Sequence, residues 1–583
     1  MNFPQQYWGY FIAVNAIVAA MYFSQSGERR KRVGQLLVSL LTAFVLAFLA
    51  VAITSNKLAK SNAGVATDQA EMQLRIVACV SSVTATMSSK MRHMLLGAVA
   101  TKAGKKPGGM FSDTANEKGN GGSTGGGNEK TGETTSGRPT HAADDQLKKK
   151  SGDLAEQLQR KLAFEGAAKA LRTAVEKNSS NALYKEKLIV LLGKEDRSAN
   201  MAEISKLVEG LKTNEVEREK KTAEAAANSA RVLNFSTIMN SLYVRDSVSH
   251  KEIEQYKERI TEHLPLGWFQ DNALMQLYTA AGAVDRTEKL KSEIDSKYAI
   301  TFFKLGLIMM IMIGSAFIGT INILIQLGTA ARKPAPPPDP VGLIVPLKTV
   351  YVVFVAWFSI MLTMSLGFHL VTEKFPQITT QPMLVALTTA LTYLLSNLPG
   401  PFLIYWLALK PQGLDFWSAL RIKSRTATAG PVKLVAAGYL AWCSAIPLIF
   451  ASAYVAQRFL HTQGSDNPVI GQIVQTAGSS SAIATFIFYM TLGVMAPIFE
   501  EILFRGFFYA AVKPHIGAFP GMLASAGLFA LLHFDKGGVL MLFAIGFVLA
   551  YTFEKTRSLL PSMVAHGLWN SGSFTMALVL FGA

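Results

Sequence analysis

The chain has 583 residues, of which 50% are hydrophobic and 17% are charged, and its formal net charge is +17. So apolar a chain is not disordered throughout. The basic excess alone would suggest a nucleic acid or an anionic membrane as partner. However, residues 301–583 hold only 16 basic and 8 acidic side chains, which lie between apolar runs. Because runs of about 20 residues can cross a bilayer, we expect a membrane protein with no nucleic-acid partner.

The apolar runs predict an all-α fold, in which a polytopic transmembrane bundle has about ten spans. Residues 1–54 are expected to form an N-terminal hairpin of two spans around the basic turn from Arg29 to Arg32. Residues 301–583 are expected to form the rest of the transmembrane domain. Its eight runs lie at about 302–327, 349–370, 384–409, 434–456, 482–512, 519–533, 539–553 and 559–581.

Lys and Arg residues concentrate in alternate loops of this bundle. They are frequent at 24–33, 328–348 and 410–433, whereas the loops at 371–382 and 457–481 have one each. Because basic loops stay in the cytoplasm, every predicted span alternates correctly and the long region after the hairpin faces the outside. We therefore expect residues 55–300 to be extracytoplasmic. The absence of an organelle signal favours a bacterial inner membrane as the location.

The expected outer region has two parts. Residues 55–144 are predicted to be a flexible linker, because the stretch at 101–139 is rich in Gly, Ser, Thr and Asn. Residues 145–300 are rich in Ala, Leu, Glu and Lys and should form a helical domain. Within it, residues 167–191 faintly resemble a tetratricopeptide helix pair, and an irregular helical bundle is the alternative. Either domain would bind a protein partner.

Two adjacent carboxylates interrupt the apolar run at 482–512. Glu500, Glu501 and Arg505 fall within six consecutive residues, although an ionised residue near the centre of a membrane helix costs about 2.5 to 3.5 kcal/mol. Glu501 and Arg505 are four residues apart, so they share a helix face and can pair. Glu500 points about 100° away, toward a different neighbour. Such charges indicate a functional site, and a buried ion pair that merely joins helices is the structural alternative.

Two further polar insertions occur in the runs that follow. His533 ends the run at 519–533, four residues after Phe529, and a histidine that serves only in packing is its alternative interpretation. His566 and Asn570 are also four residues apart, on the last run. Both side chains should therefore lie on one helix face, where they could hold one oxygen atom together.

The motifs Glu-Glu-x-x-x-Arg, Phe-x-x-x-His and His-x-x-x-Asn, in this order, resemble the signature of the type II CAAX prenyl endopeptidase and bacteriocin-processing family of intramembrane proteases. All three are complete here, at 500–505, 529–533 and 566–570. The resemblance implies an intramembrane endopeptidase with a catalytic core at about 434–583. It explains nothing in residues 1–300.

Peptide hydrolysis needs an activated water, and two of these residues suit that task. Glu500 in an apolar cavity would be a stronger base than a solvated carboxylate, so we assign it as the general base and later proton donor. His533 would hold the same water from its other side. Glu501 and Arg505 complete the expected catalytic set as the orienting pair.

The developing oxyanion also needs donors, and His566 and Asn570 are expected to supply them. In a metal-dependent mechanism, some of the same residues would instead bind a metal ion. Glu500, His533 and His566 offer a carboxylate and two imidazoles, which is the ligand set of many catalytic zinc sites. The spacing leaves open whether the cofactor is absent or is a divalent metal such as zinc. The pairing of Asn570 with His566 favours the metal-free version.

We therefore expect an enzyme that hydrolyses a peptide bond in a membrane-tethered substrate, within the lipid bilayer. Prenylated substrates are not expected in a bacterial membrane. A non-catalytic scaffold or receptor with a partner-binding outer domain is the main alternative, because the Glu501 and Arg505 pair could simply lock helices together. A transporter that relays protons through its carboxylates is a third alternative.

Overall fold

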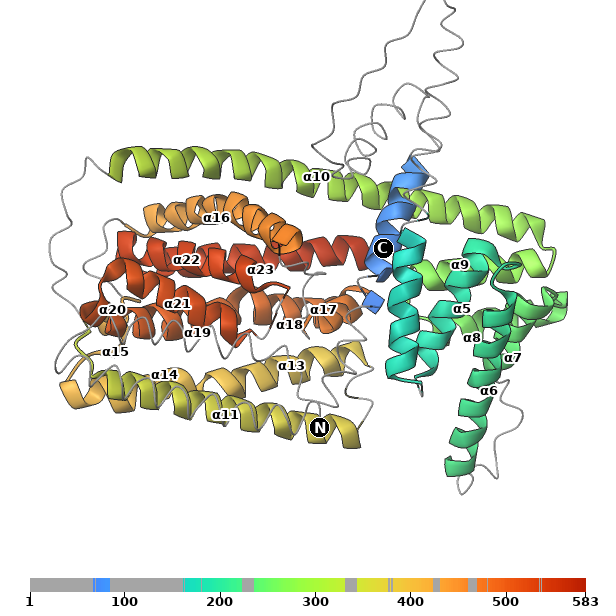
Figure 1. Cartoon of the computed structure of the whole chain (residues 1–583), viewed down its shortest axis with the longest axis horizontal. Coiled ribbons are helices and arrows are strands. Elements are labelled where there is room, and N and C mark those ends of the chain that lie inside the picture. Colours follow the sequence, from blue (N-terminus) through green and yellow to red (C-terminus); the bar gives the residue numbers. More distant parts are fainter. Residues whose placement is uncertain are drawn as a thin grey trace, which may run out of the picture.

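The computed structural model describes six stretches of the chain, with gaps of one or two residues inside some of them: 67–83, 161–222, 235–330, 343–422, 430–459 and 469–582. Every regular element in these stretches is a helix, as the sequence predicted (Figure 1). The expected hairpin at 1–54 and the Gly-rich stretch at 101–139 lie outside the described residues. Membrane helices lie side by side in one part of the molecule, and the outer helices form the other part.

The outer region contains a helical bundle with its own apolar core. Ile189, Leu242, Ile260 and Leu277 lie in this core and have no exposed surface. The described helices of the region are one at 163–177, α5 (Ala182–Asp196), α6 (Met201–Thr222), α7 (Phe235–Met239), η1 (Asn240–Arg245), η2 (His250–Glu252), α8 (Ile253–His263) and α9 (Trp268–Ala280). The first two form the helix pair expected near 167–191, and their assignment to a repeat family stays a prediction.

Residues 70–83 form a helix inside the stretch that we expected to be a flexible linker. Ala70 and Leu74 are four residues apart, share one helix face, and pack into the core of the outer bundle. Their burial supplies the free energy that orders this segment. This part of residues 55–144 is therefore structured.

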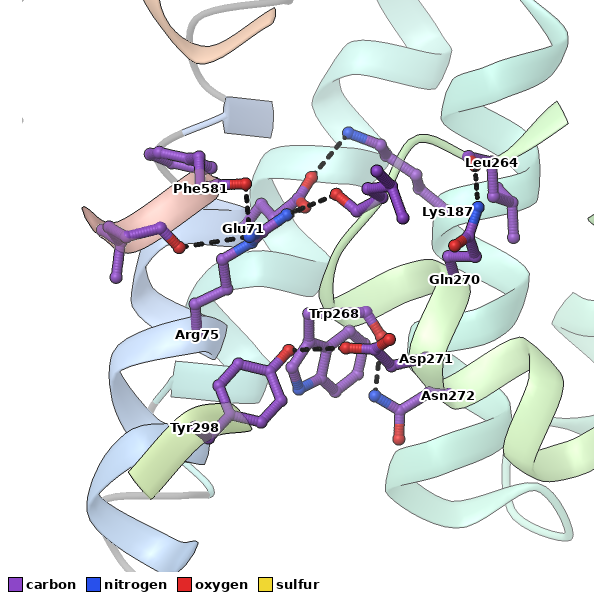
Figure 2. A network of polar contacts seen from close by, with 12 residues as sticks. Glu71, Arg75, Lys187, Leu264, Trp268, Gln270, Asp271, Asn272, Tyr298 and Phe581 are labelled. Atoms are coloured by element: carbon purple, nitrogen blue, oxygen red, sulfur yellow. Dashed lines mark hydrogen bonds and ion pairs between the residues drawn. The ribbon is translucent and has the colours of Figure 1, made fainter. Parts of the chain in front are cut away.

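A buried polar network holds this helix against the outer bundle (Figure 2). Glu71 accepts hydrogen bonds from Arg75 at 2.8 Å and from Lys187 of α5 at 2.9 Å. Arg75 also donates to the carbonyl oxygen of Leu266 at 2.6 Å. The next residue, Gly267, has a φ of 137°, and a Cβ atom there would lie 1.5 Å from Nη2 of Arg75. Only glycine leaves room for this contact.

The same arginine reaches the last membrane helix, α23 (Leu559–Phe581). Nη1 of Arg75 donates to the carbonyl oxygens of Leu580 and Phe581, at 3.1 and 3.2 Å. The carbonyl oxygens in the last turn of a helix accept no hydrogen bond from the helix itself, so they need donors from elsewhere. Arg75 therefore caps α23 and ties it to the outer bundle.

Helix α10 (Val284–Ala330) belongs to both parts of the molecule. At its beginning, Lys297 and Tyr298 donate to Asp271 of the outer bundle, at 2.9 and 3.1 Å. Farther along, large apolar side chains such as Phe317 are exposed, as expected for a surface that faces lipid. Gly319 allows α10 to approach α16 (Pro431–Phe459) closely, because a Cβ atom there would lie 1.9 Å from the carbonyl oxygen of Cys443.

Five helices in the described residues are long and apolar enough to cross a membrane: Val284–Thr329, Pro382–Gln412, Pro431–Phe459, Ala482–Ile516 and Val539–Thr556. Two shorter apolar helices, Leu347–Phe358 and Ala518–Leu532, occupy two other expected spans. Helix α23 forms at the position of the last expected span without being among the five. The count of about ten is therefore not confirmed, and its first two spans lie outside the described residues.

The membrane part packs around a core that includes Trp357, Phe504, Phe507 and Leu549. Its helices after α10 are α11 (Leu347–Lys374), α13 (Pro382–Asn397), α14 (Pro399–Leu403), η3 (Ile404–Leu409), η4 (Lys410–Gln412), α15 (Phe416–Ala419), α16 (Pro431–Phe459), α17 (Val469–Ala477), α18 (Ala482–Tyr489), η5 (Met490–Met495), α19 (Ala496–Glu501), η6 (Ile502–Tyr509), α20 (Ala510–Ile516), α21 (Ala518–Leu532), α22 (Val539–Thr556) and α23.

The span from Ala482 to Ile516 contains two π-helical stretches, η5 and η6, on either side of α19. Pro497 follows η5 and has no N–H group to donate to the carbonyl of Gly493. That carbonyl faces α23, where a Cβ atom on Gly567 would lie 2.6 Å from it. The two helices therefore approach closely beside the turn that carries the paired glutamates. Irregular turns of this kind are frequent at functional sites.

Candidate active site

Glu501 and Arg505 form the ion pair that their spacing predicted. Nη1 of Arg505 donates to Oε1 of Glu501 at 2.8 Å, and neither side chain has exposed surface. Nη2 of Arg505 donates to the carbonyl oxygen of Gly546 on α22 at 3.0 Å, and the guanidinium lies 4.6 Å from the ring centre of Phe529. The pair thus joins η6 to α21 and α22. Two buried charges are held by each other and by added polar contacts.

His566 of α23 connects the two glutamates. Its Nδ1 atom lies 2.9 Å from Oε1 of Glu501, and its Nε2 atom lies 3.7 Å from Oε2 of Glu500. A carboxylate only accepts, so Nδ1 carries the proton of this hydrogen bond. In the neutral ring, Nε2 therefore presents a lone pair to Glu500. The imidazolium form would present an N–H group instead.

His533 has the same arrangement, with a different acceptor. Its Nδ1 atom lies 2.7 Å from the carbonyl oxygen of Phe529, and its Nε2 atom lies 4.0 Å from Oε2 of Glu500. The carbonyl fixes the proton on Nδ1, so Nε2 of the neutral ring is an acceptor. Phe529 also packs against both imidazoles, with ring centres 4.6 Å from His533 and 5.6 Å from His566. The phenylalanine of the second motif thus contacts both histidines.

Glu500 is the point at which these groups converge. Its Oε2 atom is buried, has no hydrogen-bond partner among the described residues, and faces Nε2 of both His533 and His566. Its Oε1 atom accepts a hydrogen bond from the hydroxyl of Tyr393 at 2.8 Å. No sequence pattern marks Tyr393, because a tyrosine in an apolar helix is common and its partner lies 107 residues away.

Asn570 lies one turn after His566 on α23. Its Nδ2 atom donates to the carbonyl oxygen of Leu492 in η5 at 3.0 Å. This contact uses one of the two N–H groups of the amide, and the other is left for a second acceptor. Asn570 therefore lies one turn from His566, and it makes no direct contact with Glu500.

The sequence offered Glu500, His533 and His566 as candidate ligands of a metal ion. A carboxylate and two imidazoles, each with its Nδ1 proton fixed by an acceptor, are the chemistry that a zinc ion needs. As they are arranged in the described part of the chain, no three His, Cys, Asp or Glu side chains form a group that could hold a metal ion.

Residues 482–572 match the family model of Rce1-like type II CAAX prenyl endopeptidases. This segment is therefore an Rce1-like domain. The resemblance that the three motifs predicted is confirmed for these residues, which include Glu500, His533 and His566. Together with the apolar helices, the match makes the protein a multi-pass integral membrane protein related to membrane proteases.

A curated relative supports the same assignment. The putative membrane peptidase YdiL of Bacillus subtilis (strain 168) is 29% identical over 85 residues, which are 15% of this chain. The match spans 35% of the length of that relative. No solved structure matches the chain. The family-model match covers residues 482–572 and does not include the outer bundle.

Proposed function

We propose that the protein is an intramembrane endopeptidase that hydrolyses a peptide bond of a membrane-associated substrate. The observation that carries the proposal is the convergence of Nε2 of His533 and Nε2 of His566 on Oε2 of Glu500, at 4.0 and 3.7 Å. Three side chains that can donate or accept a proton, Glu500, His533 and His566, lie together at one buried position. They come from three different helices. The Rce1-like match supports peptide hydrolysis as the reaction.

Glu500 is the proposed general base. A distance of 4.0 Å between Oε2 of Glu500 and Nε2 of His533 is too long for a direct hydrogen bond, and it suits one water that donates to both. Glu500 takes a proton from this water, and the hydroxide attacks the carbonyl carbon of the scissile bond. The same carboxyl group then gives the proton to the departing amine.

The oxyanion of the tetrahedral intermediate is held by Asn570 and His566. Asn570 has a free N–H group, and His566 offers an N–H group from Nε2 when it is an imidazolium. Glu501 accepts from Nδ1 of this ring at 2.9 Å, which keeps Nε2 turned toward the site. Glu501 and Arg505 thus act through the ring that they orient. The arrangement resembles the way in which a buried carboxylate supports a catalytic histidine in serine proteases.

A divalent metal such as zinc is the alternative cofactor. Glu500, His533 and His566 would hold it, and when bound it would supply a hydroxide at neutral pH and polarise the scissile carbonyl. The proposed steps above use only side chains of this chain. Asn570 beside His566 supports that choice, since an amide suits oxyanion binding better than zinc ligation.

The proposed substrate is a membrane-tethered peptide or protein that reaches the site within the bilayer. We further propose that the protein resides in a bacterial inner membrane with residues 55–300 outside the cytoplasm. The proposed units are a hairpin at 1–54, a connecting region at 55–144, an outer domain at 145–300 that binds a protein partner, and a transmembrane domain at 301–583 with its catalytic core at about 434–583. The continuity of α10 from the outer bundle into the membrane supports this arrangement.

The proposal is tested by comparing newly formed protein termini in membranes that contain the wild-type protein or Glu500→Gln. Glu554→Gln is a matched control, because Glu554 is also a membrane-helix glutamate but accepts from Tyr509 and Lys513 instead of facing the site. We expect a set of termini that disappears with Glu500→Gln and persists with Glu554→Gln. Identical termini in all three samples would overturn the proposal and favour a non-catalytic scaffold.

A further inference from the structure

The two oxygens of Glu500 have different surroundings. Oε2 faces the histidines and has no hydrogen-bond partner in the described residues, whereas Oε1 accepts from the Tyr393 hydroxyl at 2.8 Å. The end of a glutamate side chain rotates easily, because its last torsion has no sharp minima. A donor on one oxygen fixes the plane of the carboxylate. The bond to Tyr393 therefore determines that the other oxygen points toward His533 and His566.

Helix α13, which carries Tyr393, is itself held in place at successive turns of one face. Val385 lies in a small apolar core with Phe488 of α18. One turn later, the hydroxyl of Thr389 donates to Oε1 of Gln472 in α17 at 3.3 Å. Tyr393 follows after another turn on the same face. The hydroxyl of Tyr393 is thus brought to Glu500 by a helix that is anchored at the two turns before it.

Tyr393 lies outside the Rce1-like domain, which covers residues 482–572. Its α13 helix packs beside that domain through α18, so the site draws one of its polar groups from a preceding helix. The segment that matches the family model contains the base and both histidines, but not the hydroxyl that holds the base. Residues before 482 therefore contribute to the geometry of the site.

We propose that Tyr393 is a positioning residue for catalysis, which holds the Glu500 carboxylate so that Oε2 faces the attacking water and both histidines. This inference rests on the proposed role of Glu500 as the general base. A phenol has one proton, and here it is donated to the carboxylate. Phenylalanine would keep the ring and lose only this donor. The loss should leave substrate binding intact and impair the chemical step.

The test is a kinetic comparison of the wild type, Tyr393→Phe and Tyr551→Phe in proteoliposomes. The probe is an internally quenched peptide that spans a cleavage site found by the comparison of termini above. Tyr551 is a matched control, because it is a membrane-helix tyrosine whose hydroxyl donates to Gln326, at 3.2 Å, instead of to the site. We expect Tyr393→Phe to lower kcat by about 10- to 100-fold, as for loss of a hydrogen bond to a charged group that positions a reactant, with KM unchanged. Tyr551→Phe should retain wild-type kcat.

Two further measurements separate positioning from folding. Tyr393→Phe should stay folded at the assay temperature, with a thermal midpoint only slightly below that of the wild type because one buried hydrogen bond is lost. Replacement of Tyr393 by 4-aminophenylalanine should restore kcat, because the amino group again donates a proton. Wild-type kcat in Tyr393→Phe would overturn the inference, as would a failure of 4-aminophenylalanine to restore the rate in a folded protein.

Glu500→Gln in the same assay distinguishes the two proposals. If Glu500→Gln is inactive while Tyr393→Phe has wild-type kcat, only the inference about Tyr393 fails. If Glu500→Gln cleaves the peptide as fast as the wild type, the proposed function is wrong, and so is the inference about Tyr393 that depends on it.

Discussion

The Nδ1 atom of His566 lies 2.9 Å from Oε1 of Glu501, which precedes it by 65 residues in the chain. The same oxygen accepts from Arg505 at 2.8 Å. One buried carboxylate therefore balances a guanidinium and fixes the orientation of an imidazole that faces Glu500. The adjacent glutamates have different contacts, since Glu501 accepts from His566 and Arg505 while Oε2 of Glu500 faces Nε2 of His533 and His566.

The first prediction concerns the ion pair. Glu501→Gln leaves Arg505 buried without its counter-charge, which costs about 3 to 5 kcal/mol when one partner of a buried pair is removed. We expect a lower thermal midpoint in detergent micelles and a loss of cleavage. In the double variant Glu501→Gln/Arg505→Met, the midpoint should recover because no unpaired charge is left. Cleavage should not recover, because His566 still lacks its carboxylate acceptor. Recovery of both properties would show that the pair only joins helices.

The second prediction concerns metal dependence. If Glu500, His533 and the oxyanion donors perform the reaction, dialysis against a zinc chelator should leave the cleavage rate unchanged. The metal content of the dialysed protein is measured by mass spectrometry, so that removal is verified. Loss of cleavage that added zinc restores would contradict the metal-free mechanism.

The sequence predicted contacts between residues of one motif, whereas it did not predict contacts between segments that are far apart in the chain. The spacing of four residues placed Glu501 beside Arg505 because helix geometry is local. The role of Tyr393 could not be predicted, because only the packing of α13 brings it to Glu500, 107 residues away. The helix at 70–83 was also missed, since the partners of Arg75 include a carbonyl 505 residues away. Neither contact leaves a periodic signal in the sequence.

The third prediction concerns the network that caps α23. Arg75→Met removes the donor to Leu580 and Phe581 and leaves Glu71 with one fewer partner. Removal of one partner from a buried ionic network costs about 3 to 5 kcal/mol, so the thermal midpoint should fall and amide exchange at 575–582 should increase.

Arg172→Met is the control for this experiment. Arg172 pairs with Glu203, but their side chains are 43% and 37% exposed, and such pairs contribute about 0 to 1 kcal/mol. An equal fall of the midpoint in both variants would contradict a specific role of the buried network.

The fourth prediction concerns the pH dependence of stability in the outer region. Burial raises the pKa of Asp68 to about 6, against the opposing charge of Lys187. In the unfolded chain this pKa is about 3.9. Between these values the folded protein holds a proton that the unfolded chain has released, so this group lowers the free energy of unfolding as pH rises from about 4 to about 6. Asp68→Asn should remove that decline.

The measurement is the thermal midpoint of the wild type and of Asp68→Asn between pH 4 and pH 7. The advantage of the variant should grow as pH rises to about 6 and stay constant above it. Glu71 is present in both proteins, and its charge contributes to the raised pKa of Asp68, so the comparison reports the titration of Asp68 beside that charge. A difference that does not change with pH would contradict the assigned protonation of Asp68.

The most direct test of the central claim is the cleavage rate of purified Glu500→Gln in proteoliposomes, with the wild-type protein and Glu554→Gln measured beside it. Glutamine keeps the size of the side chain and cannot accept the proton of water, so Glu500→Gln should be inactive while its thermal midpoint stays near that of the wild type. Glu554→Gln should still cleave. A Glu500→Gln protein that cleaves at the wild-type rate would contradict the account.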